Sequence, residues 1–108
     1  MFDQGMIVYI DCEPSAGKEI TKRRPALIVS INAYNKSGMA LVCPITTKER
    51  SDNAVFIDLP DGLPVTGQIN TMQVRCFDLE ARNAEPIGPA PDETLQMALS
   101  VIQRFIGR

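Results

Sequence analysis

Histidine is absent from this chain of 108 residues, and that absence restricts the possible chemistry more than any other feature of the composition. Histidine is the side chain whose ordinary pKa lies near neutral pH, so acid–base catalysis here has to use a carboxylate, Arg, Lys, Thr or Ser. The commonest nuclease and hydrolase arrangements are therefore excluded. Because the chain also lacks a Cys-x-x-Cys pair, a zinc site is not expected, and we predict no bound metal or cofactor.

Cysteines and long apolar runs are also scarce. Cys12, Cys43 and Cys76 each lie in an apolar, strand-like run, so we interpret them as buried small hydrophobic residues in a reducing cytoplasm. No apolar run approaches the roughly 20 residues that span a membrane, and the N-terminus does not resemble a signal peptide. We therefore predict a cytoplasmic protein with no membrane partner, folded as one domain over 1–108.

The charges are unevenly distributed along the chain. A net charge of −2 argues against a protein that coats nucleic acid through bulk electrostatics. Residues 14–50 nevertheless hold seven Lys and Arg against two acids, whereas residues 51–108 hold four against eight. A solvated face is the ordinary explanation of such asymmetry. A local basic site on a mildly acidic body is also what a compact RNA enzyme could show.

Short apolar segments separated by Pro, Gly and polar residues predict a mainly β fold. The expected segments are strands at 6–12, 25–30, 39–45 and 54–59, a turn or short helix at 32–38, one or two strands within 66–78, and an edge strand at 83–87. The segment 39–45 is almost continuously apolar, so we predict that it is buried on both faces.

One convincing helix is predicted, at about 91–106, with Pro91 near its first position and Gly107 after its end. Its apolar residues fall on one face, which we expect to pack on the sheet: Leu95, Ala98, Leu99, Ile102, Phe105 and Ile106. Several short strands followed by one helix imply a small, strongly curved sheet or partial barrel.

A few residues could act on a phosphodiester. Arg24 precedes Pro25, which favours an extended conformation from which the guanidinium can present its planar fork to a phosphate. Glu19 lies in the preceding charged loop, close enough to line the same cleft. Thr46 and Thr47 follow an apolar strand, so their hydroxyl groups are expected at its end. A surface arginine, a solvated loop acid and ordinary strand threonines are the plainer interpretations, and the residues alone leave both open.

The order of these segments resembles the MazF/PemK/Kid family of toxins from toxin–antitoxin pairs, which are ribonucleases that cut single-stranded RNA. Arg24-Pro-Ala-Leu-Ile-Val-Ser30 matches the family's Arg-Pro-Ala/Val-Leu-x-x-Ser signature. Further segments match in register over most of the chain: Gly5–Pro14, Gly17–Ile20, Asn32–Asn35, Cys43–Thr47, Gln73–Arg75 and Asp78–Arg82. The resemblance implies the family's small SH3-like barrel with a C-terminal helix, assembled as a homodimer.

Residue by residue, the resemblance implies that Arg24 is the catalytic arginine, that Thr46 contacts the phosphate and that Glu19 is a loop acid of the active site. The residues expected to bind RNA are Lys18, Lys22, Arg23, Thr47, Lys48, Gln73 and Arg75. The chain departs from the family at Met6, Ile20 and Met72, where many members place an acid, Gln and Asp.

The mechanism that these roles imply needs no metal. Glu19 takes the proton of a ribose 2′-OH, Arg24 neutralises charge on the phosphoryl oxygens and helps to protonate the leaving 5′-oxygen, and Thr46 hydrogen-bonds a non-bridging oxygen. The products are a 2′,3′-cyclic phosphate and a 5′-OH.

The expected partners are single-stranded RNA, a second copy of the chain, and an antitoxin with an acidic, disordered C-terminal tail. Two alternatives stay open. One is a CcdB-like toxin that binds DNA gyrase without cutting RNA, and the other is a catalytically disarmed interaction barrel.

Overall fold

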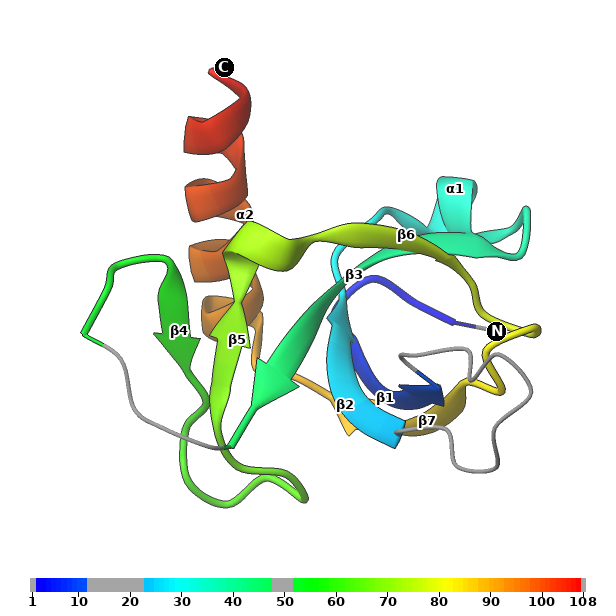
Figure 1. The fold of residues 1–108 in the computed structure, drawn as a ribbon, viewed down its shortest axis with the longest axis horizontal. Coiled ribbons are helices and arrows are strands. Elements are labelled where there is room, and N and C mark those ends of the chain that lie inside the picture. The colour runs from blue at the N-terminus through cyan, green and yellow to red at the C-terminus, as the bar shows by residue number, and fades with distance from the viewer. Residues whose placement is uncertain (1, 12–22, 48–51, 108) are drawn as a thin grey trace, which may run out of the picture.

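The computed structural model describes residues 2–11, 23–47 and 52–107 of the chain. The elements follow in the order β1 (Met6–Asp11), β2 (Arg23–Ile28), α1 (Asn32–Asn35), β3 (Met39–Thr46), β4 (Phe56–Asp58), β5 (Gln68–Asn70), the 3₁₀ helix η1 (Thr71–Gln73), β6 (Arg75–Asp78), β7 (Glu85–Pro89) and α2 (Asp92–Ile106). Figure 1 shows the strands bent into a curved sheet, and α2 contacts β4 and η1 at one side of it. Within the described ranges, no helix combines the length and apolar character needed to cross a membrane.

The strands form one antiparallel sheet in the order β4-β5-β3-β2-β1-β7. β6 also pairs with β3, so β5 and β6 pair with successive parts of that strand. β4 and β7 are the outer strands and do not pair with each other, so the sheet formed by the described residues is not closed. The predicted mainly β fold, with a curved, partly barrel-like sheet and one C-terminal helix, is confirmed.

Alternation of side chains along the strands creates two apolar layers, because successive residues point to opposite faces. The first, here called the helix-side core, consists of Ile7, Leu27, Val29, Cys43, Ile45, Ile57, Val65, Ile69, Leu95, Ala98 and Val101. The second core lies on the other face of the sheet and consists of Val8, Ile10, Ala26, Ile28, Ala40, Val42, Phe77 and Leu79. Residues of even number in β1, β2 and β3 therefore share the face of the second core.

A buried hydrogen-bond cluster joins the N-terminal segment, α1 and β3. Asn35 Nδ2 donates to the carbonyl oxygens of Phe2, at 3.0 Å, and of Ser30, at 3.1 Å. Ser30 Oγ donates to Asn35 Oδ1 and accepts from the N–H of Leu41 at 3.0 Å. Buried polar groups need such partners. Ser30 and Asn35, which end two of the segments that match the family, thus stabilise the fold through these hydrogen bonds.

The helix begins and ends close to its predicted bounds, but its last turn does not pack as predicted. The buried residues of α2 are Thr94, Leu95, Ala98 and Val101. Phe105 and Ile106 are 50% and 72% exposed, so the prediction that they pack on the sheet is wrong. The reason is visible in Figure 1, where the final turns of α2 extend past the strands.

Two burial predictions are also wrong on β3 and β6. Leu41 is 39% exposed, so β3 is not buried on both faces along its whole length. Cys76, which pairs directly with Leu41, is exposed as well. On β3 the helix-side core begins only at Cys43, and this face of the sheet is therefore uncovered at the Leu41–Cys76 pair. Cys43 is buried as predicted, and Cys12 lies outside the described residues.

Candidate functional site

Arg24 and Thr46 are brought to neighbouring strands and to the same face of the sheet. β2 pairs with β3 through Ala26 opposite Pro44. Arg24 and Thr46 lie two residues beyond this last pair, each on the face that its strand turns to the second core, because successive residues of a strand alternate in side. The two candidate residues predicted at successive strand ends therefore share one face of the sheet, at the adjoining ends of neighbouring strands.

Paired residues extend from each of these two residues across the sheet. Ile10 pairs with Arg24 on one side. On the other side Thr46 pairs with Gln68, which in turn pairs with Asp58. Gln68 Nε2 donates to Asp58 Oδ1 at 2.8 Å. Thr46, Gln68 and Asp58 are all polar, so this end of the sheet presents hydrogen-bonding groups on the face that also carries Arg24.

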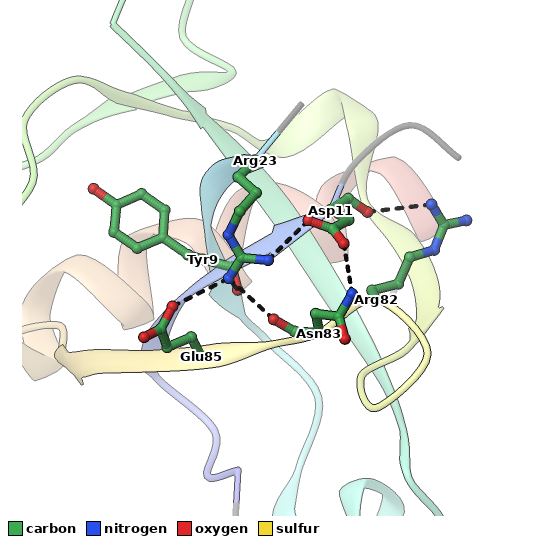
Figure 2. A network of polar contacts seen from close by, with 6 residues as sticks. All are labelled: Tyr9, Asp11, Arg23, Arg82, Asn83 and Glu85. Carbon is green, nitrogen blue, oxygen red and sulfur yellow. Dashed lines mark hydrogen bonds and ion pairs between the residues drawn. The ribbon is translucent and has the colours of Figure 1, made fainter. Parts of the chain in front are cut away.

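Arg23, although adjacent to Arg24, lies on the opposite face and is held by polar contacts (Figure 2). Its Nη1 donates to Asp11 Oδ1 at 2.8 Å. Its Nη2 donates to the carbonyl oxygen of Asn83 at 3.0 Å and forms an ion pair with Glu85 Oε1 at 3.2 Å. These contacts leave Arg23 less available to RNA than Arg24, and its predicted role in RNA binding stays a prediction.

The carboxylate of Asp11 is the centre of this network. Asn83 Nδ2 donates to Asp11 Oδ2 at 2.7 Å. This hydrogen bond, together with the hydrogen bond and charge of Arg23 and the charge of Arg82, lowers the pKa of the Asp11 carboxyl. The Arg82 side chain also donates to the carbonyl oxygen of Asp11 at 3.2 Å. Asp11 and Arg23 flank segment 12–22, so the network joins the two strand ends from which that segment departs.

The Arg24 guanidinium differs from Arg23 in having no intramolecular hydrogen bond or ion pair within the part of the chain that the structure describes. It is half-buried, and it is on the face that carries Thr46. A guanidinium without an internal partner is a binding site for an anion, because its fork of N–H donors matches phosphate geometry. Because successive side chains of β2 point to opposite faces, Arg23 is held within the fold while Arg24 stays available to a ligand.

A pocket of about 240 Å³ lies beside Thr46, where the loop between β4 and β5 meets the end of β3. The residues that line it are Thr46, Thr47, Leu59, Pro60, Asp61, Thr66, Gly67 and Gln68. Gly67 permits the close approach: its φ is +132°, and a Cβ atom there would lie 2.3 Å from the carbonyl oxygen of Thr46. The sequence did not reveal the contribution of Asp61, Thr66 and Gln68, since 60–64 indicated only a turn and 66–78 only strands.

Gln73 and Arg75, both predicted to bind RNA, are exposed. Arg75 pairs with Val42, which belongs to the second core, so Arg75 shares a sheet face with Arg24. Val42 lies four residues before Thr46 on β3, a separation of about 13 Å at 3.3 Å per residue. The Arg75 guanidinium lies over the ring of Phe77, 5.1 Å from its centre. The second cation on this face is therefore displaced along the sheet from the first.

The remaining predicted site residues, Glu19, Lys18, Lys22 and Lys48, lie outside the described residues. Of the predicted catalytic set the structure thus places Arg24 and Thr46, and it brings them to one face at the adjoining ends of β2 and β3. Among the residues it describes, no three Cys, Asp or Glu side chains gather closely enough to hold a metal ion.

Comparison with known proteins covers nearly the whole chain. Residues 3–106 match a family described as PemK-like, MazF-like toxin of type II toxin–antitoxin system. The endoribonuclease toxin ChpB of Escherichia coli (strain K12) is 37% identical over 109 residues, covering 97% of this chain and 94% of the relative. The endoribonuclease toxin MazF of the same organism is 33% identical over 106 residues, with the same coverage.

Solved structures of MazF proteins have the same fold as this chain. A crystal structure of MazE–MazF from Deinococcus radiodurans superposes on the chain with a TM-score of 0.88 at 32% sequence identity, covering 97% of this chain and 95% of that one. MazF alone from the same organism gives a TM-score of 0.86.

Proposed function

The chain belongs to the PemK-like, MazF-like family of toxins of type II toxin–antitoxin systems, and from this premise we propose that it is a sequence-specific endoribonuclease that cuts single-stranded RNA without a metal ion. Cleavage of mRNA would stop translation and growth. The relatives that are 33% and 37% identical carry the name endoribonuclease toxin, which supports the activity. The observation that carries the proposal is that Arg24, whose guanidinium has no partner among the described residues, lies on the same sheet face as Thr46, at the adjoining end of the neighbouring strand.

In the proposed reaction the nucleophile is the substrate's own 2′-OH. Its proton passes to the carboxylate of Glu19, the 2′-oxygen bonds to the adjacent phosphorus, and the bond between phosphorus and the 5′-oxygen breaks. The 5′-oxygen takes up a proton from water, and the hydroxide left behind takes the proton from Glu19, which restores the carboxylate. The products therefore end in a 2′,3′-cyclic phosphate and a 5′-OH. Glu19 lies outside the described residues, and its role rests on the sequence.

Arg24 and Thr46 act on the charge that builds up on the phosphate in this reaction. A guanidinium stays protonated in proteins, so Arg24 neutralises charge, and the part in protonating the 5′-oxygen that the resemblance implied is not assigned to it. Its two outer nitrogens can donate hydrogen bonds to two phosphoryl oxygens at once. The hydroxyl of Thr46, on the same face of the sheet, can donate to a non-bridging oxygen. Groups fixed in place before the reaction stabilise such charge at little reorganisation cost.

The proposed partners besides RNA are an antitoxin and a second copy of the chain. The Deinococcus radiodurans relative was solved as MazE–MazF, which supports an antitoxin for this chain also. We expect an acidic, disordered C-terminal tail to cover Arg24 and Thr46 as an RNA strand would. Large apolar side chains that the described chain leaves exposed, among them Phe105 and Ile106, support a homodimer. The proposed site of action is the cytoplasm, where mRNA is translated.

The proposal is tested by incubating the purified protein with single-stranded RNA in EDTA. We expect discrete cuts, and no cut where the ribose on the 5′ side of the cleavage site is replaced by deoxyribose. Cutting of the deoxy substrate would disprove the 2′-OH mechanism. Inhibition of gyrase without RNA cleavage would instead support the CcdB-like alternative, and neither activity would support the disarmed barrel.

The role of Arg24 is tested by substitution. Arg24→Ala and Arg24→Lys should both lose most of the cleavage rate while keeping the circular dichroism spectrum of the folded protein, because Lys cannot form the two-pronged contact. Thr46→Ala should cost less, about 10²–10³-fold at most. Arg104→Ala, an exposed arginine in the last turn of α2, is the matched control and should cleave normally. A near-normal rate for Arg24→Lys would show that Arg24 is only a surface charge.

A further inference from the structure

We infer that the pocket beside Thr46 holds one guanine base of the RNA next to the scissile phosphate, and that Asp61 is the residue that recognises it. The inference rests on the proposed endoribonuclease function and deepens it, because it names a base and the residue that selects it. Its support is the position, size and chemistry of the pocket.

The position of the pocket suits a base adjacent to the cleaved bond. Thr46 and Thr47 belong to its lining, and Thr46 is also the proposed phosphate contact, so a base in the pocket lies next to the phosphate. Its volume of about 240 Å³ is below the roughly 300–1,000 Å³ of sites for drug-sized ligands. It therefore suits one nucleobase and not a longer stretch of RNA.

The lining combines an apolar wall with a few polar groups, which is the usual composition of a small-molecule site. Leu59 and Pro60 supply the apolar surface against which the flat face of a base can pack. Threonine hydroxyls supply groups that can either donate or accept. Asp61 supplies the one carboxylate, and it makes no hydrogen bond or ion pair with any described residue.

The chemistry of a carboxylate selects guanine among the four bases. An ionised Asp only accepts hydrogen bonds, and its two oxygens can accept a pair of parallel donors. The Watson–Crick edge of guanine presents two adjacent donors, N1–H and the 2-amino group. Adenine and cytosine place an acceptor beside their amino group, and uracil has a single N–H between two carbonyls. Proteins read these edges in single-stranded RNA, where the bases are unstacked.

Equilibrium binding tests the inference separately from cleavage. The probes are fluorescent hexamers with 2′-O-methyl groups throughout, which lack the nucleophile: one of uridine only, and three with a single central guanosine, inosine or adenosine. With the wild-type chain, we expect the guanosine strand to bind about 5–150 times more tightly than the uridine strand. Inosine, which lacks the 2-amino group, should fall between them, and adenosine should resemble uridine.

The decisive variant is Asp61→Asn, because specific recognition and simple charge repulsion predict different outcomes. Removing a negative charge should leave the affinity for the uridine strand unchanged or higher. Loss of the acceptor pair should lower the affinity for the guanosine strand nearly to that of uridine. An electrostatic role alone would raise both affinities together, and that result would overturn the inference.

Glu80→Gln is the matched control, since it removes the same charge from an exposed position elsewhere. Glu80 follows β6, and Asp78 of that strand pairs with Met39 at the start of β3. Met39 is seven residues from Thr46, which is about 23 Å along the strand, so Glu80 lies near the end of β3 that is remote from the pocket. This variant should keep the guanine preference. If the wild-type chain shows no guanine preference, or if Asp61→Asn keeps it, guanine recognition by Asp61 is refuted. Cleavage of RNA can persist in either case, so the proposed function would still stand. A guanine preference without any cleavage refutes the proposed function instead.

Discussion

Replacing Gly67 by alanine should be the most damaging single-methyl change among the glycines that the structure describes. At φ = +132° an L-residue is strained, at a cost of about 1–3 kcal/mol in the free energy of unfolding. The added Cβ would also lie 2.3 Å from the carbonyl oxygen of Thr46 and 3.0 Å from its carbonyl carbon, both backbone atoms that cannot rotate away. Such overpacking costs about 1–3 kcal/mol more.

Gly62 in the same loop separates these two contributions. Its φ is +94°, but a Cβ atom there would meet nothing within 4 Å, so Gly62→Ala should show the backbone strain alone. Together the two effects predict a loss of about 2–6 kcal/mol for Gly67→Ala and about 1–3 kcal/mol for Gly62→Ala. For a domain of this size each kcal/mol corresponds to roughly 4–8 °C in Tm.

Thermal unfolding followed by circular dichroism, and urea unfolding at 25 °C, measure the difference between these variants. RNA cleavage adds a second readout, because the clash displaces the backbone of Thr46. The part of Gly67→Ala that is still folded should therefore cut more slowly than folded Gly62→Ala. If both variants unfold within a couple of degrees of each other, the close approach of the β4–β5 loop to the end of β3 is disproved.

Two further predictions concern titratable groups. The lowered pKa of Asp11 means that its ionised form stabilises the fold above the ordinary carboxyl value of 3.8 and that this stabilisation is lost as pH falls below it. Urea unfolding should therefore show the wild-type advantage over Asp11→Asn to be largest at neutral pH and smaller at pH 3, and an advantage independent of pH would contradict the network. Burial raises the pKa of the Cys43 thiol to about 12, whereas Cys76 is exposed. Iodoacetamide at pH 8 should modify the Cys76 peptide and spare the Cys43 peptide, as measured by mass spectrometry, and equal modification would show that Cys43 is not buried.

The secondary structure was predictable because it depends on local pattern. Apolar runs bounded by Pro, Gly and polar residues indicate the strands, and the capping residues indicate the bounds of α2. Burial was less predictable, because it depends on which element covers a given face. Leu41 and Cys76 look like core residues in sequence, yet α2 does not reach the part of the sheet where they pair. Phe105 continues the apolar stripe of α2 beyond the strands that it would need to touch.

The candidate site was predictable only in part, for the same reason. The order of Arg24 and Thr46 along the chain placed them at successive strand ends, and strand alternation alone could have separated Arg23 from Arg24. The contacts of Arg23 with Asn83 and Glu85 could not be found in this way, because these residues are distant in sequence. They lie beside Arg23 only because β7 pairs with β1. The pocket is likewise a tertiary contact, made where Gly67 meets Thr46.

The pairing of Asp11 with Arg23 also bears on how the strands find their alignment during folding. A slip of one residue between β1 and β2 would turn every side chain of β2 to the other face and exchange the positions of Arg23 and Arg24. Charge does not oppose this exchange, because both residues are arginines, and the following run 26–29 is apolar at every position. Contacts from Asp11, Asn83 and Glu85 meet Arg23 in the native alignment. The groups of Asp11, Asn83 and Glu85 on one face of the sheet therefore determine which of the two arginines lies on that face and which lies on the opposite face, which also carries Thr46.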